Sequence, residues 1–151
     1  MTRLLGIDLG ERRIGLAIAE PGVEPPRPFA TLARAGTLTA DATRLQTVVR
    51  DQRIDELVVG LPLDASGAEG PMATAARTWA TAMGETLGLP VHLRDERLSS
   101  HVAETRLGSM PRGRGGGPPS RTQRDRYRAR VDREAAAVIL QDELDARERQ
   151  G

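Results

Sequence analysis

The stretch RLLGIDLGERRIGLAIA, residues 3–19, decides the fold class. Its first part, residues 3–9, is a short apolar run that ends in an acid and a glycine, which is typical of a buried strand. After a turn at Gly10–Arg13, the apolar residues from Ile14 to Ala19 predict a second strand. The two strands are therefore expected to pair as a hairpin.

Beyond this hairpin, strands alternate with helices. In chain order the expected elements are a strand at 29–32, a helix at 40–52 begun by Thr39, a strand at 56–60, a helix at 72–87, a strand at 91–94, and helices at 99–107 and 131–146. The strand at 56–60 is expected to be parallel, because a helix precedes it. This order predicts one α/β domain over residues 1–151, with a mixed β-sheet flanked by helices.

The composition excludes several kinds of chemistry. All 22 basic residues are arginine, and the 151-residue chain has neither lysine nor cysteine. Disulfides, thiolate metal sites, Schiff bases and the lysine of phosphate-binding loops are therefore excluded. The two histidines, His92 and His101, are too few for a histidine-rich zinc site. Carboxylates, hydroxyls and arginines remain to carry any reaction.

The sequence carries no sign of export or of membrane insertion. Its first residues become charged within a few positions, so they lack the apolar core of a signal peptide. No apolar run is long enough to span a membrane. We therefore expect a cytoplasmic protein that does not bind membranes.

Charge is unevenly distributed along the chain. The net charge is +1, yet seven arginines and Asp125 give residues 112–130 a charge of +6 and leave −5 for the rest. The segment contains GRGGGPP, so we expect a flexible Arg/Gly-rich loop at about 109–127. A solvated charged loop is one interpretation of it. Binding of a phosphate backbone is the other, since guanidinium groups make paired hydrogen bonds to phosphate.

Three acids stand where strands end or a helix begins. Asp8 closes the first strand, Glu96 follows the strand at 91–94, and Asp132 opens the last helix. Each also has a structural interpretation. Asp8 could form a turn, Glu96 could pair with Arg94 or Arg97, and Asp132 could stabilise the helix start. An ionised acid inside an apolar strand is nevertheless costly unless it is paired or binds a cation.

Taken together, the three acids favour a metal site. Strand ends at one edge of a mixed sheet and a helix starting above them can converge. Converging carboxylates without a histidine cluster suit Mg²⁺ or Mn²⁺, which prefer oxygen ligands. Two such ions can activate water and stabilise the leaving oxygen in phosphodiester hydrolysis. With a separate arginine surface, this combination predicts a metal-dependent nuclease.

Four sequence blocks resemble the YqgF/RuvX family, described as pre-16S rRNA nucleases and Holliday-junction-resolvase-like proteins with an RNase H-like fold. The blocks are LLGIDLGERRIGLAIAE at 4–20, VVGLPLDASGAEGPMA at 58–73, RDERLSSHVAE at 94–104 and VDREAAAVILQDEL at 131–144. They occur in the family's order and span nearly the whole chain. The resemblance implies an RNase H-like mixed sheet and hydrolysis of phosphodiester bonds in structured nucleic acid.

The same resemblance assigns roles to residues. Asp8, Glu96 and Asp132 correspond to the family's catalytic, metal-binding acids, with Mg²⁺ or Mn²⁺ as the ion. A fourth carboxylate is not assigned, because Asp95 would point away from Glu96 along a strand. Ser99 is interpreted as a helix N-cap. The residues expected to bind nucleic acid are Arg12, Arg13, Arg112, Arg114, Arg121, Arg124, Arg126 and Arg128.

Several functions stay open on the sequence. The resemblance favours 5′-end processing of pre-16S rRNA, with a Holliday junction resolvase acting on branched DNA as the alternative. A non-catalytic nucleic-acid-binding factor in ribosome maturation or transcription is a third hypothesis. An actin-like ATPase is disfavoured, because that architecture needs two such domains. A junction resolvase would act as a two-fold homodimer, so a homodimer also stays open.

Overall fold

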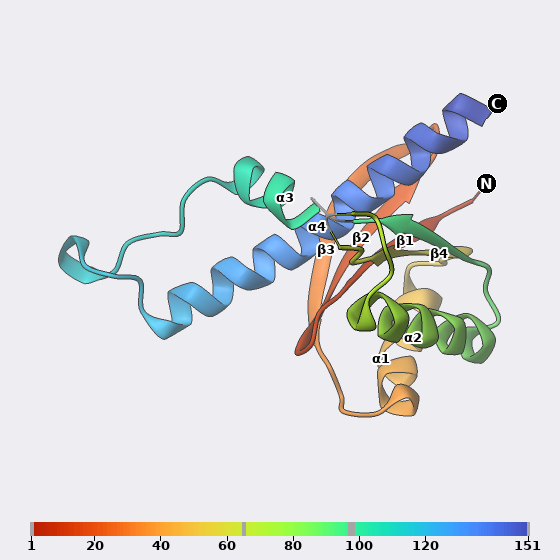
Figure 1. Cartoon of the computed structure of the whole chain (residues 1–151), viewed down its shortest axis with the longest axis horizontal. Helices are drawn as coiled ribbons and strands as arrows, with labels where there is room; N and C mark the ends of the chain where they lie inside the picture. The colour runs from red at the N-terminus through yellow and green to blue at the C-terminus, as the bar shows by residue number, and fades with distance from the viewer. Residues whose placement is uncertain (1, 65, 97–98, 151) are drawn as a thin grey trace.

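A five-stranded mixed sheet with helices on both faces forms the body of the protein (Figure 1). The computed structural model describes residues 2–64, 66–96 and 99–150. The strands are β1 (Leu4–Leu9), β2 (Arg13–Glu20), β3 (Glu24–Ala33), β4 (Glu56–Leu61) and β5 (Val91–Asp95). The helices are α1 (Leu38–Asp51), α2 (Pro71–Leu87), α3 (Ser99–Leu107), the 3₁₀ turn η1 (Arg114–Gly116) and α4 (Arg121–Gln150).

The sheet has the order β3-β2-β1-β4-β5, so the first hairpin and the later strands meet at β1. Strands β1, β2 and β3 pair antiparallel, whereas β4 lies parallel to both β1 and β5. The predicted hairpin, the parallel β4 and the single α/β domain are thus confirmed. No helix among the described residues is both long and apolar enough to cross a membrane.

Alternate residues of the strands serve two different cores. Leu5 and Ile7 of β1 pack in the larger core, under α1 and α2, with Leu45 and Met83. Leu4 of β1 faces the other way and packs against α4 with Leu140. Because side chains alternate along a strand, Asp8 lies on the α4 face of the sheet. The period-two pattern of β1 therefore sets which helix the acid meets.

The third strand is longer than predicted. The expected strand at 29–32 is part of β3, which begins at Glu24 and includes Pro25, Pro26 and Pro28. Proline lacks a backbone N–H and is confined to sheet edges, and β3 is an edge strand. The prolines thus mark the first part of an edge strand, of which only residues 29–32 were predicted.

Two helix starts also differ from the prediction. The helix α1 begins at Leu38, and Thr37 is its N-cap, accepting a hydrogen bond from the Ala40 N–H at 3.1 Å. Thr39, expected to begin this helix, lies inside its first turn. The last helix begins at Arg121, ten residues before the predicted start at 131. Residues 121–127 of the predicted loop are therefore helical.

A capping box explains the early start of α4. The Ser120 N–H donates to Oε1 of Gln123 at 2.8 Å, and the Gln123 N–H donates to Oγ of Ser120 at 3.1 Å. This reciprocal pair satisfies two backbone N–H groups that the first turn leaves without helical partners. The S-x-x-Q signal directly after Pro118 and Pro119 is visible in the sequence.

A buried carboxylate connects the core to the β1–β2 turn. Asp41 is 1% exposed and accepts hydrogen bonds from Nε1 of Trp79 at 3.1 Å and from the Ala35 N–H at 2.8 Å. Arg34 pairs with Asp41 at 3.4 Å and also donates to the Gly10 carbonyl at 3.2 Å. The turn that follows Asp8 is therefore attached to the core through two side chains.

Candidate active site

Asp8 lies at the end of β1, on the sheet face that α4 covers, and is 8% exposed. Burial raises its pKa most, followed by the neighbouring carboxylate of Glu96, and Asp132 contributes further. The guanidinium of Arg13 acts in the opposite direction. Because burial and two acids outweigh one arginine, Asp8 holds its proton well above the ordinary range of an aspartate.

Glu96 follows β5 and meets Asp8 from the side of β4. Its N–H donates to the Leu61 carbonyl at 3.0 Å, which fixes the chain direction after the strand. Its carboxyl group forms a hydrogen bond with Asp8 and accepts another from Oγ of Ser99 at 3.1 Å. Burial raises the pKa of Glu96, while the hydrogen bonds from Asp8 and Ser99 lower it.

Ser99 is a site residue that the sequence reading missed. It was expected only to cap a helix, but it is the first residue of α3, is 4% exposed, and its hydroxyl contacts both the carbonyl and the carboxyl group of Glu96. The acid-x-x-Ser spacing is the available signal. Arg97, one of the two predicted partners of Glu96, lies outside the described residues.

Asp132 lies on α4 and is bound to an arginine of the hairpin. Its Oδ2 accepts a hydrogen bond from Nε of Arg13 at 2.5 Å, and the two side chains are 20% and 33% exposed. The acid is near enough to raise the pKa of Asp8. Arg13, expected to bind nucleic acid, therefore also anchors the third acid of the predicted triad.

Glycines let α4 and Glu96 come this close to the sheet. A Cβ on Gly15, the β2 partner of Asp8, would lie 2.0 Å from the Asp132 carbonyl oxygen. A Cβ on Gly60 of β4 would lie 2.8 Å from the Glu96 carboxyl group and 2.6 Å from Ile139. The hairpin and β4 therefore carry glycine where α4 and Glu96 approach the sheet.

The donor set fits a hard divalent cation only in part. Asp8 and Glu96 offer buried carboxylate oxygens in mutual contact, and either a proton or a cation can relieve their repulsion. Among the described residues, no three acidic or histidine side chains are grouped as metal ligands would be. The structure thus brings Asp8 and Glu96 together, whereas Asp132 is held by Arg13.

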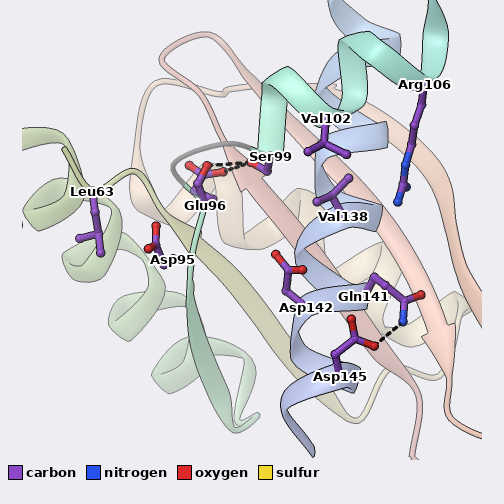
Figure 2. A pocket seen from close by; sticks show the side chains of 10 residues that line it. All are labelled: Leu63, Asp95, Glu96, Ser99, Val102, Arg106, Val138, Gln141, Asp142 and Asp145. Atoms are coloured by element: carbon purple, nitrogen blue, oxygen red, sulfur yellow. Dashed lines mark hydrogen bonds between the residues drawn. The ribbon is translucent and has the colours of Figure 1, made fainter. Parts of the chain in front are cut away.

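A cleft of about 870 Å³ opens beside Glu96, between β5, α3 and α4 (Figure 2). Asp95 lines the same cleft, although strand alternation predicted that it would point away from Glu96. The reason is that β5 ends at Asp95, so the alternation of side chains along the strand does not extend to Glu96. Asp142 and Asp145, three residues apart on α4, also line the cleft and were not anticipated. Burial, then Asp145, raises the pKa of Asp142.

The arginine-rich segment projects from the body, as Figure 1 shows. We call residues 108–130 the arginine arm; it comprises a connection, η1 and the first turns of α4. Within the described chain, none of its arginines forms an ion pair with a carboxylate. All seven are exposed: Arg112, Arg114, Arg121, Arg124, Arg126, Arg128 and Arg130. Arg12 is exposed as well, in the β1–β2 turn.

Comparison with known proteins gives the family. The sequence profile of the RuvX family, described as Holliday junction resolvase, matches residues 2–146. A relative from Anaeromyxobacter dehalogenans is 46% identical over 145 residues, which cover 96% of this chain and 98% of the relative. The chain belongs to the RuvX family. A second member, from Roseiflexus, is 34% identical over 95% of this chain and 94% of its own length.

Both relatives of this RuvX chain carry the name "Putative pre-16S rRNA nuclease". A solved structure, Thermus thermophilus RuvC in complex with a Holliday junction substrate, superposes with a TM-score of 0.54 at 16% identity, covering 92% of each chain. At that identity the likeness concerns the fold, and it confirms the predicted RNase H-like architecture. The three acids of this RuvX member stay predicted catalytic residues.

Removal of the Ser99 hydroxyl should impair the RuvX site. The hydrogen bond from Ser99 lowers the pKa of Glu96, so this pKa should rise in Ser99→Ala. The acidic limb of the pH–rate profile should therefore move to higher pH. A lost hydrogen bond to a charged group should reduce kcat at neutral pH by at least about tenfold. Ser100→Ala, at an exposed neighbouring position of α3, is the control. Equal pH profiles for the two variants would remove Ser99 from the site.

The raised pKa of Asp8 also predicts that Asp8→Asn stabilises the fold. The folded state binds the Asp8 proton more tightly than the unfolded chain, so wild-type stability falls as pH rises above about 4. Asparagine does not titrate and can still donate to Glu96. In buffer with a chelator, the variant should unfold at least about 3 °C higher at pH 8, with little difference at pH 4. Asp51→Asn, a substitution at an exposed position, should leave the unfolding temperature unchanged at both pH values.

Proposed function

We propose that the protein is a metal-dependent nuclease that hydrolyses phosphodiester bonds in structured nucleic acid in the cytoplasm, with pre-16S rRNA as its substrate and 5′-end processing as its reaction. The observation that carries the proposal is the buried contact between Asp8 and Glu96 beside an open cleft. Buried acids in contact are costly in a purely structural role. The names of the relatives support the reaction and the substrate.

The residues present divide the chemistry among them. Asp8 and Glu96 would hold Mg²⁺ or Mn²⁺, and Asp132 on α4 is the proposed third acid. When bound, such an ion activates water and stabilises the leaving oxygen. Ser99 orients the Glu96 carboxyl group through its hydroxyl, and Arg13 fixes the position of Asp132. Glycines at 15 and 60 leave the space in which these groups approach.

The charges of the protein also suit an anionic substrate. Acids at the cleft repel phosphate, so binding needs positive charge close by. The arginine arm supplies this charge at the N-terminal end of α4, which begins at Arg121. Arg12, exposed in the turn beside Asp8, adds a second cation near the acids. We therefore expect nucleic acid to contact the arm and the β1–β2 turn together.

A Holliday junction resolvase is the second candidate function. The description of the family and the RuvC-like fold favour it. This candidate requires a homodimer, because paired cuts across a junction need two sites related by a two-fold axis. A monomer by solution mass, in the presence of junction DNA, would count against it. A non-catalytic binding factor is the third candidate, and loss of all cleavage would favour it.

The deciding experiment compares substrates and ions directly. Purified protein is incubated with a pre-16S rRNA 5′ fragment and with a four-way DNA junction, in Mg²⁺, in Mn²⁺ and in chelator. We expect cleavage of the RNA with either ion and none with chelator. Cleavage of the junction alone would replace rRNA processing by resolvase activity. Equal cleavage with and without chelator would refute metal dependence.

A further inference from the structure

The arginine arm and the acidic site are connected by one uninterrupted helix. Helix α4 runs from Arg121 to Gln150, so Asp132 lies eleven residues inside it. At about 1.5 Å per residue, Arg121 is about 16 Å from Asp132 along the helix axis, and Arg128 is about 6 Å away. A helix has no joint at which this spacing could change.

Three of the arginines share a helix face with Asp132. Arg121, Arg124, Arg128 and Asp132 follow one another at spacings of three, four and four residues, which places them along one face. Arg126 and Arg130 lie roughly 120–160° around the axis from Asp132. The arm therefore carries two unlike sets of arginines: a row of three that leads to the site, and a pair directed elsewhere.

Contacts within the arm hold the connection against the helix. The Tyr127 hydroxyl donates to the Gly108 carbonyl at 2.7 Å, and Nε2 of Gln123 donates to the Arg112 carbonyl at 2.8 Å. Tyr127 and Leu107 also pack against the small cluster of Ala103, Val131 and Ala135. These contacts join the connection to the first turns of α4 at Gly108 and at Arg112.

The N-terminal end of α4 carries more positive charge than its side chains alone contribute. Its first turn contains no acid, and the helix dipole places a partial positive charge at the N-terminus. The only acid among the arm's arginines is Asp125, which is exposed. Phosphate groups along the helix would relieve repulsion among neighbouring guanidinium groups.

We propose that Arg121, Arg124 and Arg128 form a phosphate-binding row that guides one strand along α4 to the acidic pair and so sets the distance from bound duplex to cut. The proposal rests on the nuclease function proposed above. Where α4 runs parallel to the axis of a duplex, about 16 Å corresponds to about five base-pair steps of about 3.4 Å each. A substrate therefore needs about five base pairs on the arm side of the cleaved bond, whereas Arg126 and Arg130 have a smaller share in binding.

Two matched double variants test the row. Arg124→Ala with Arg128→Ala removes two charges from it, and Arg126→Ala with Arg130→Ala removes two from the other side of the same helix. Binding of an RNA stem–loop and of a four-way DNA junction is measured by fluorescence anisotropy against salt. We expect the first pair to weaken binding at least about tenfold and to lower the salt slope by about 2. The second pair should change binding less than half as much, and Arg50→Ala on α1 should leave it unchanged.

Shortening one duplex arm from about ten to about two base pairs tests the distance. For wild type, affinity should drop below about five base pairs, and the first double variant should lose this dependence. Equal effects of the two double variants, or no length threshold, would overturn the row. Because these are binding measurements, they stand if no substrate is cleaved. In that case the nuclease proposal fails while the row remains.

Discussion

Asp8→Asn is expected to abolish cleavage while binding stays intact. The substitution removes a carboxylate from the buried pair with Glu96, keeps the side-chain shape, and leaves the arginine arm unchanged. Loss of a metal-binding acid in a hydrolytic site costs several kcal/mol of transition-state stabilisation. We therefore expect kcat/KM to fall at least about 10³-fold, which corresponds to about 4 kcal/mol. Affinity for the uncleaved RNA fragment should stay within about twofold.

The matched control is Asp51→Asn, which removes an exposed carboxylate at the C-terminal end of α1. Its activity should equal that of wild type. The expected stabilisation of Asp8→Asn gives a further check, because an unfolded variant could not explain the lost cleavage. Identical cleavage products from Asp8→Asn and wild type would show that the reaction takes place elsewhere.

Gly15→Ala is expected to cause the largest loss of stability. A Cβ at this position would lie 2.0 Å from the Asp132 carbonyl oxygen and 2.8 Å from the Arg133 nitrogen, both in the helix backbone. A helix backbone cannot rotate aside as a side chain can, so α4 must move away from β2. Overpacking of this kind costs about 3 kcal/mol, which should lower the unfolding temperature by about 6–12 °C.

The same displacement should also weaken the site, since it carries Asp132 away from Asp8 and Arg13. Gly70→Ala is the control, because a Cβ there meets nothing within 4 Å and the residue has a negative φ of −88°. Thermal unfolding and cleavage are measured for both variants. A Gly15→Ala protein as stable as Gly70→Ala would mean that α4 does not lie against β2 as described.

Local patterns were sufficient to predict most of the fold. The apolar runs at 3–9, 14–19 and 56–60 have the spacing of buried strands, and the structure confirms each of them. Errors arose where one signal hid another. The prolines of β3 obscured an edge strand, and the glycines at 115–117 drew attention from the Ser120–Gln123 capping box just after them.

The site was harder to anticipate because its contacts join distant parts of the chain. Strand ends indicated Asp8 and Glu96, which the structure brings together. The pairing of Arg13 with Asp132 links residues 119 positions apart, and no local pattern encodes it. Asp142 and Asp145 reach the cleft only because α4 crosses the sheet beside β5. The positive charge of residues 112–130 was evident from the composition. The division of these arginines between two helix faces could not be predicted, because it depends on α4 beginning at Arg121.

The side chains that connect Trp79 to Gly10 give the protein an optical reporter of its own. The chain has a single tryptophan, and its indole donates to Asp41, whose partner Arg34 holds the turn beside Asp8. We therefore expect a movement of that turn to change the polar surroundings of this indole. Intrinsic fluorescence should therefore report movements of the turn beside the acidic pair without any label. In the Arg34→Met variant, which lacks the contacts to Gly10 and Asp41, the fluorescence should no longer respond to these movements.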